Sequence, residues 1–199
     1  MMHLKILVAA TILLAAVTSS PVSGGRDAGI AAYHRNDYPA ALKELIPDAQ
    51  TGDAKAQYYM GLLYARGHGV GKDPAAAAAW FRKSADQGNP EAQFDLGHLY
   101  RSGSGVPQDD ATAVIWWRKA ADRGQTFAQS SLAEMYLDGK GVERDLVQAY
   151  KWTILAEPRT QQRRINWNSF EARSIARMMK PGELAKAQKL VKKWLNTRR

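Results

Sequence analysis

The sequence predicts an all-α fold, a right-handed superhelical solenoid of stacked antiparallel helix pairs that ends in a C-terminal helical cap. The first observation is a repeat: WFRKSADQGNPEAQ, Trp80 to Gln93, returns as WWRKAADRGQTFAQ, Trp116 to Gln129, 36 positions later. The second is that apolar residues inside each unit recur at helical spacing. A fixed period between 20 and 50 residues is typical of proteins whose units bury their apolar faces by stacking on one another.

The period of 36 defines three full repeats, 52–87, 88–123 and 124–159, and a degenerate unit at 26–51. Together they make a predicted solenoid over 26–159. Several residue types stay fixed at equivalent positions of the three repeats: Gly52, Gly88 and Gly124; Ala56, Ala92 and Ala128; Gln57, Gln93 and Gln129; Tyr64, Tyr100 and Tyr136; Trp80, Trp116 and Trp152.

Each repeat is predicted to hold two amphipathic helices. In the first repeat two apolar stripes have helical spacing: Ala56, Met60, Leu63 and Tyr64, then Ala77, Trp80, Phe81, Ser84 and Ala85. Small residues such as Gly61 favour close approach of the two helices. A stacking platform for a cofactor or a nucleobase is the rival explanation of the aromatic positions, but their helical spacing in every repeat favours core packing.

The helix ends carry their own signals. Asp53 and Asn89 precede the first helices, and an aspartate at position 73, 109 or 145 precedes each second helix, where a side chain can accept a hydrogen bond from a free backbone N–H. Gly67 and Gly88 follow helices at places that favour a positive φ. These residues predict where the helices begin and end.

The second repeat, GNPEAQFDLGHLYRSGSGVPQDDATAVIWWRKAADR, resembles a Sel-one-like repeat (SLR), a relative of the tetratricopeptide repeat. The resemblance covers 52–159 and, in weakened form, 26–51. Two departures fall in the third repeat, where Ala133 replaces the usual glycine and ILAEPRT lacks the usual ending. The resemblance implies an α-solenoid and a noncatalytic protein–protein interaction scaffold.

Residues 1–24 are typical of a secretory signal peptide. One lysine precedes twelve residues, Ile6 to Val17, that only a threonine interrupts, and small and polar residues follow. Twelve residues are too few to cross a membrane, which takes about 20. We therefore expect an exported protein, periplasmic or secreted; the alternative is an uncleaved N-terminal anchor. The chain has no cysteine, which excludes a lipoprotein anchor and disulfides.

The positive charge lies at the C-terminus. The chain carries a net charge of +9, and the segment from Glu157 onward contains 12 lysines and arginines but only 3 acidic residues. Residues 160–199 are predicted to form a basic helical cap, with helices near 161–179 and 181–195. The last has Leu184, Val191 and Trp194 on one face and lysines on another. It can cover the last repeat, as solenoids require, and can also contact an anionic surface.

The sequence contains no constellation that points to catalysis, a metal or a cofactor. The four histidines do not recur at the repeat period, and none has the spacing of a metal site. We expect His68 and His98 to be solvated. The glycine-rich turns do not match a phosphate-binding loop, and the basic residues lack the aromatic pattern of nucleic-acid binding.

Two functions follow. The first is a scaffold that binds a protein or peptide partner outside the cytoplasm. The alternative is a hydrolase of cell-wall or β-lactam substrates, as the resemblance to cysteine-rich members of the family implies, although this chain has no cysteine.

The candidate binding residues lie on one stripe of the first helices and change from repeat to repeat. In related superhelical repeats the first helices line the concave face, where extended ligands lie. The alternative is that these are unconstrained solvent positions. The aromatic members favour binding, since aromatic side chains often carry interface energy. The predicted site consists of Tyr59, Leu62, Arg66, Asp95, His98, Phe127, Ser131 and Glu134.

Overall fold

A computed structural model describes residues 24–157, 165–167 and 169–197, and the predicted signal peptide lies outside these ranges. The described residues form helices and no strand. In chain order the helices are α1 (Gly24–His34), α2 (Tyr38–Gln50), α3 (Ala54–Arg66), α4 (Pro74–Asp86), α5 (Pro90–Ser102), α6 (Asp110–Asp122), α7 (Thr126–Asp138), α8 (Leu146–Ala156), α9 (Phe170–Met178) and α10 (Pro181–Asn196).

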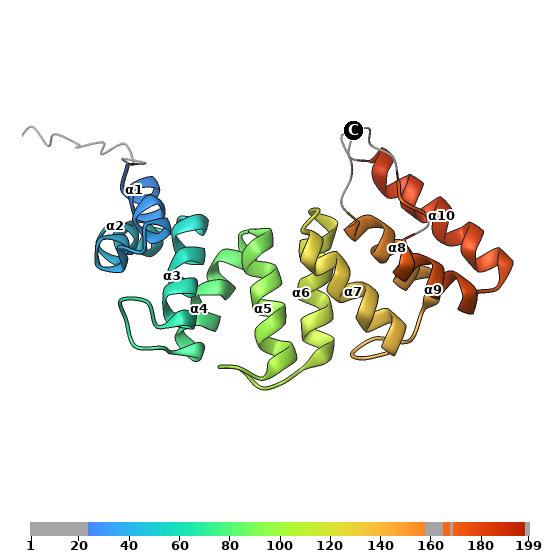
Figure 1. Ribbon diagram of the computed structural model, residues 1–199. Coiled ribbons are helices and arrows are strands. Elements are labelled where there is room, and N and C mark those ends of the chain that lie inside the picture. Colours follow the sequence, from blue (N-terminus) through green and yellow to red (C-terminus); the bar gives the residue numbers. More distant parts are fainter. Residues whose placement is uncertain (1–23, 158–164, 168, 198–199) are drawn as a thin grey trace, which may run out of the picture.

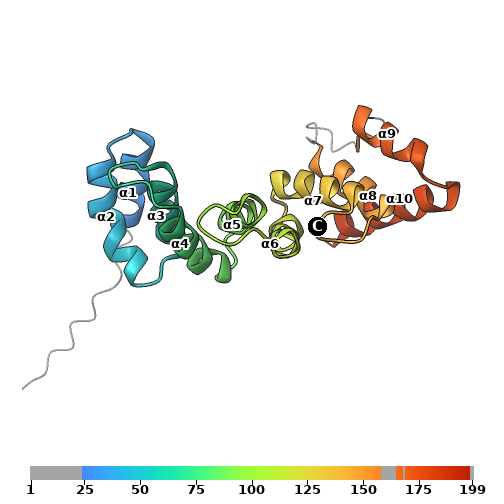
Figure 2. The same cartoon turned by 90° about the horizontal axis from the view of Figure 1, so that it is seen from below.

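The helices stack in chain order into an elongated arch (Figures 1 and 2). Within each pair, α1 packs on α2, α3 on α4, α5 on α6 and α7 on α8, and each second helix then packs on the first helix of the next pair. The α1 and α10 helices lie at opposite ends of the arch. The predicted all-α solenoid is confirmed. No described helix is long and apolar enough to span a membrane.

The predicted capping residues begin and end the helices of the repeats. The Asp53 carboxylate accepts a hydrogen bond from the Ala56 N–H at 2.8 Å, and the Asn89 side chain caps α5 in the same way. Asp73, Asp109 and Asp145 each accept two N–H bonds at the start of α4, α6 and α8. Gly67, with φ of 72°, ends α3 in the left-handed conformation that favours glycine.

The predicted close approach within a pair is present in the first two repeats. A Cβ on Gly61 would lie 2.5 Å from the Phe81 ring, and a Cβ on Gly97 would lie 2.6 Å from the Trp117 ring. Heavy atoms do not approach so closely without a shift. A glycine on the first helix therefore makes room for an aromatic ring on the second.

Three buried glutamines join successive pairs. Gln57, Gln93 and Gln129 are each at most 5% exposed. The Nε2 group of each donates to the carbonyl of the residue eight positions earlier, at 3.0–3.1 Å, in the second helix of the preceding pair. These carbonyls lie near helix ends, and each also accepts from the backbone N–H of the glycine that follows its helix, at 2.9–3.3 Å. The repeated glutamine therefore adds a second hydrogen bond at the helix end and ties each pair to the one before it.

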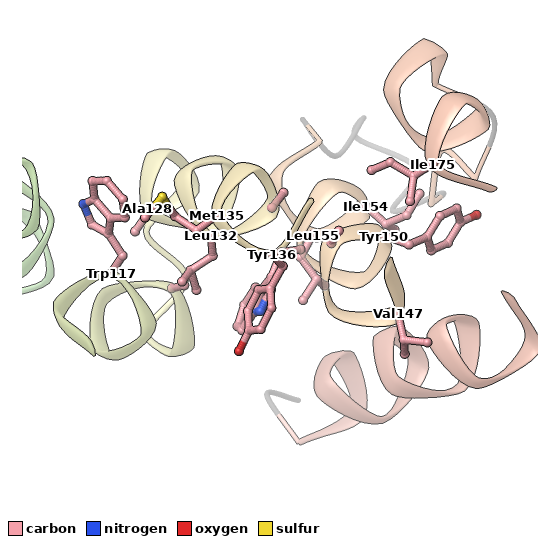
Figure 3. Close-up of a cluster of buried hydrophobic side chains, with 14 of the residues drawn as sticks. Trp117, Ala128, Leu132, Met135, Tyr136, Val147, Tyr150, Ile154, Leu155 and Ile175 are labelled. Carbon is pink, nitrogen blue, oxygen red and sulfur yellow. The ribbon is translucent and has the colours of Figure 1, made fainter. Parts of the chain in front are cut away.

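Two helices follow the last repeat and pack against α8. The α10 helix buries Ala187 and Val191, and Val147 of α8 points toward it in Figure 3, as expected for a cap. The α9 helix is shorter than the helix predicted near 161–179. It begins at Phe170, because the Ser169 hydroxyl caps it, and residues 165–167 are not helical. Residues 158–164 of that prediction lie outside the described ranges.

Candidate interaction surface

Four residues of the predicted site are exposed on the first helices: Arg66, His98, Phe127 and Glu134. Phe127 is 68% exposed, and its ring centroid lies 5.9 Å from that of Phe94 in the neighbouring first helix. An exposed phenylalanine gains little for folding, because its apolar surface stays in water. Phe127 is therefore available to a partner.

The part of the site near the N-terminus is engaged by the degenerate unit. The Tyr59 ring lies edge-on to Tyr33 of α1 at 5.1 Å, and its hydroxyl lies 3.0 Å from Nε2 of His34. Arg66 donates to the Tyr33 hydroxyl at 2.6 Å. Leu62 is half-buried between two core clusters. These three residues therefore make packing contacts within the protein, in addition to any contact with a ligand.

Asp95 and Ser131 are half-buried on α5 and α7. Burial raises the pKa of the Asp95 carboxyl to about 6, although a hydrogen bond with the Tyr58 hydroxyl and the charges of His98 and Arg66 lower it. Burial and the nearby Asp95 in turn raise the pKa of Tyr58 above its ordinary value. Asp95 therefore joins α5 to α3.

The expectation of a solvated His68 is wrong. Its ring is half-buried and stacks on Tyr38 at a centroid distance of 4.1 Å, because the turn after α3 folds back onto α2. His98 is exposed as expected. Among the described residues, no group of three or more histidine or acidic side chains is placed to hold a metal ion.

Sequence reasoning missed a groove between α7, α8 and α9. It has a volume of about 660 Å³, and of the predicted site residues only Glu134 lines it. The lining is mostly apolar, with Leu137 from α7 and Phe170, Ile175 and Met178 from α9. The signal for it was present, because Ala133 and Glu157, both departures from the repeat pattern, lie in its wall.

The comparisons with known proteins agree with this architecture. The model of the Sel1 repeat matches residues 54–89, 90–125 and 126–156, with the same period as the repeats defined above. None of the curated proteins compared with the chain matches it.

Two solved structures are similar to the chain. A Sel1 repeat protein from Oxalobacter formigenes is 34% identical, with a TM-score of 0.64 over 66% of this chain and 53% of its own. The protein c5321, a protective antigen present in uropathogenic Escherichia coli strains and displaying an SLR fold, is 27% identical, with a TM-score of 0.56 over 86% of this chain and 45% of its own. The chain thus spans about half the length of each. Because the repeat model matches just over half of its 199 residues, this chain belongs to the Sel1 repeat family.

Proposed function

We propose that this protein is an exported, noncatalytic scaffold that binds a protein or peptide along its first helices. Sel1 repeat proteins generally serve interactions between proteins. The observation that carries the proposal is the contrast along the first helices. The buried positions repeat, whereas the stripe of predicted site residues changes, and its exposed members include Phe127 at 68% exposure.

Site-specific crosslinking tests this surface. A photoreactive amino acid at position 98, 127 or 134 should capture the same protein in the native host. A label at Ile115, which is 52% exposed on the second helix α6, serves as the control. Capture from Ile115 alone, or different proteins from the three surface positions, would contradict the proposal.

The proposed export rests on the apolar run at the N-terminus. One similar structure is described as a protective antigen, which agrees with export. N-terminal sequencing of protein from the native host should find a start near residues 20–26. An intact Met1 on soluble protein from the cytoplasm would refute export.

Two further experiments test the remaining parts of the proposal. The five lysines Lys180, Lys186, Lys189, Lys192 and Lys193 are exposed on and beside α10. They should bind vesicles with anionic lipid and not neutral ones, and binding should decline with salt. A chromogenic β-lactam should stay intact with the purified protein, and turnover would favour the hydrolase alternative.

A further inference from the structure

Two aromatic residues that fill the space beside a helix pair are absent from the third repeat. In the first repeat Tyr58 of α3 and Phe81 of α4 lie 5.7 Å apart between ring centroids. In the second repeat Trp117 of α6 donates from Nε1 to the Phe94 carbonyl of α5. The equivalent residues of the third repeat are Ser130 and Thr153.

The matching change occurs on the first helix. Gly61 and Gly97 make room for the rings of the first two repeats, and their equivalent is Ala133, which faces no such ring. Ser130, Ala133 and Thr153 all line the groove. The groove therefore lies where the third repeat has lost the rings that fill the first two.

The end of α8 adds a charge to this space. Ala85 and Ala121 are at most 1% exposed at the end of the first two repeats, and their equivalent is Glu157. The α9 helix packs against α8, as α5 packs against α4, but it has 9 residues where α5 has 13. The short α9 leaves Phe170 and Met178 74% and 47% exposed at the groove.

Among the residues that the structure describes, three carboxylates line the groove and no lysine or arginine does: Glu134 on α7, Glu157 after α8 and Glu171 on α9. Within the described ranges, none of the three forms an ion pair. Charges of one sign that gather in a cleft with apolar walls reinforce one another's field. The groove therefore favours an occupant that is apolar in its middle and positively charged at its edges.

We propose that this groove binds a partner peptide through one or two apolar side chains flanked by lysine or arginine. The volume of about 660 Å³ lies within the usual range for ligand pockets, roughly 300–1,000 Å³. An aliphatic or aromatic side chain would contact Leu137, Ile175 and Phe170, and the flanking cations would approach the glutamates. This inference rests on the proposed scaffold function and names the chemistry of the segment that the scaffold holds.

Fluorescence anisotropy with three labelled hexapeptides tests the proposal. The first is Arg-Lys-Phe-Leu-Lys-Arg, the second replaces its basic residues with glutamate, and the third replaces Phe-Leu with Gly-Ser. Only the first should bind, because the other two each lack one half of the complementarity. Binding should weaken as salt is raised. Equal binding of the acidic peptide or of the Gly-Ser peptide would overturn the proposal.

Variants of the full chain then locate the bound peptide. The double variant Ala133→Gly, Thr153→Trp rebuilds the glycine and ring of the second repeat inside the groove and should weaken binding at least about tenfold. Glu134→Gln and Glu171→Gln should each weaken it by about threefold to tenfold. Glu143→Gln, in the exposed turn before α8, is the matched control and should leave affinity unchanged.

Circular dichroism checks that each variant folds. If the tryptophan variant does not fold, Ser130→Phe restores the first-helix aromatic of the second repeat and answers the same question. Unchanged affinity in a folded, filled groove would overturn the proposal. The proposal would also fail if the natural protein forms a dimer and the filled-groove variant does not. The occupant of the groove would then be a second copy of the chain. If the peptides fail to bind while position 127 still captures its partner, this inference fails and the scaffold function stands.

Discussion

The first two repeats and the third share one backbone plan and differ in what fills it. In all three, an aspartate caps the second helix and a buried glutamine bonds to the preceding pair. In the first two, Phe81 and Trp117 are at most 4% exposed inside the stack, whereas Thr153 in the third is half-buried at the edge of a groove. Capping and helix spacing therefore preserve the backbone of the repeat. The loss of the ring at position 153, together with the short α9, distinguishes the open third repeat from the two closed ones.

The link to the next helix changes in the same place. Arg82 and Arg118 donate to the hydroxyls of Tyr100 and Tyr136 in the following first helix. The equivalent residue in the third repeat is Ile154, which lies beside Ile175 of α9 (Figure 3). A polar link suited to another repeat has become an apolar one. The third repeat is thus adapted to end the stack.

The largest expected effect comes from removing α10. A chain that ends at Lys180 loses Ala187 and Val191 and exposes Val147 and its neighbours on α8. At about 1.5–3 kcal/mol for each fully buried large apolar side chain, the loss is on the order of 5 kcal/mol. We expect an earlier melting transition and lower solubility. Replacement of Lys186, Lys189 and Lys193 by glutamine is the control, and equal melting of the truncated and full chains would show that α10 is not a cap.

The next effect distinguishes the closed repeats from the open one. Phe81→Ala should lower the free energy of unfolding by about 3–5 kcal/mol, because it leaves a cavity in a close-packed interface. Thr153→Ala should change it by about 0.5 kcal/mol or less, since no ring fills that place. Urea unfolding followed by circular dichroism measures both. Similar losses for the two variants would mean that the third repeat is as closely filled as the first.

A smaller effect separates two aromatic residues of the predicted site. Tyr59→Ala removes the contacts with Tyr33 and His34 and should cost about 2 kcal/mol of stability. Phe127→Ala should leave the melting temperature nearly unchanged, since its ring is 68% exposed. Thermal melting of the two variants checks this. Loss of partner crosslinking without loss of stability is expected only for Phe127.

Most of the helical plan could be predicted from the sequence, because it depends on local signals. Asp73 and Gly67 act within a few residues of their own positions, and the period repeats the signals three times. The start of α9 was missed, since no repeat exists there to compare. The packing of Tyr59 and the burial of Asp95 depend on contacts with α1 and α3 across 25 and 37 positions, which no local pattern encodes. In the sequence, the groove left only two signs, the departures from the repeat pattern at Ala133 and Glu157. That these residues line a groove could be seen only once the position of α9 was known.

The smallest predicted effect is a pH dependence at the closed junction between the first two repeats. Asp95 of α5 has a pKa of about 6, raised chiefly by burial, and its neighbours are Tyr58, His98, Arg66 and Glu91. The ordinary value is 3.8. Between these values the unfolded chain releases its proton while the folded chain keeps it. The contribution of Asp95 to stability is therefore fully present below about pH 4 and is lost as the pH rises to about 6.

Asp95→Asn removes this titration and keeps an oxygen that can accept from Tyr58. The variant and the natural protein should unfold alike near pH 4, and at pH 7 the variant should be more stable by on the order of 1 kcal/mol, after allowance for partial solvent screening. Urea unfolding at pH 4, 5, 6 and 7 measures the difference in stability between the two chains. A constant difference across this range would show that Asp95 titrates normally and that the Tyr58–Asp95 contact is open to water.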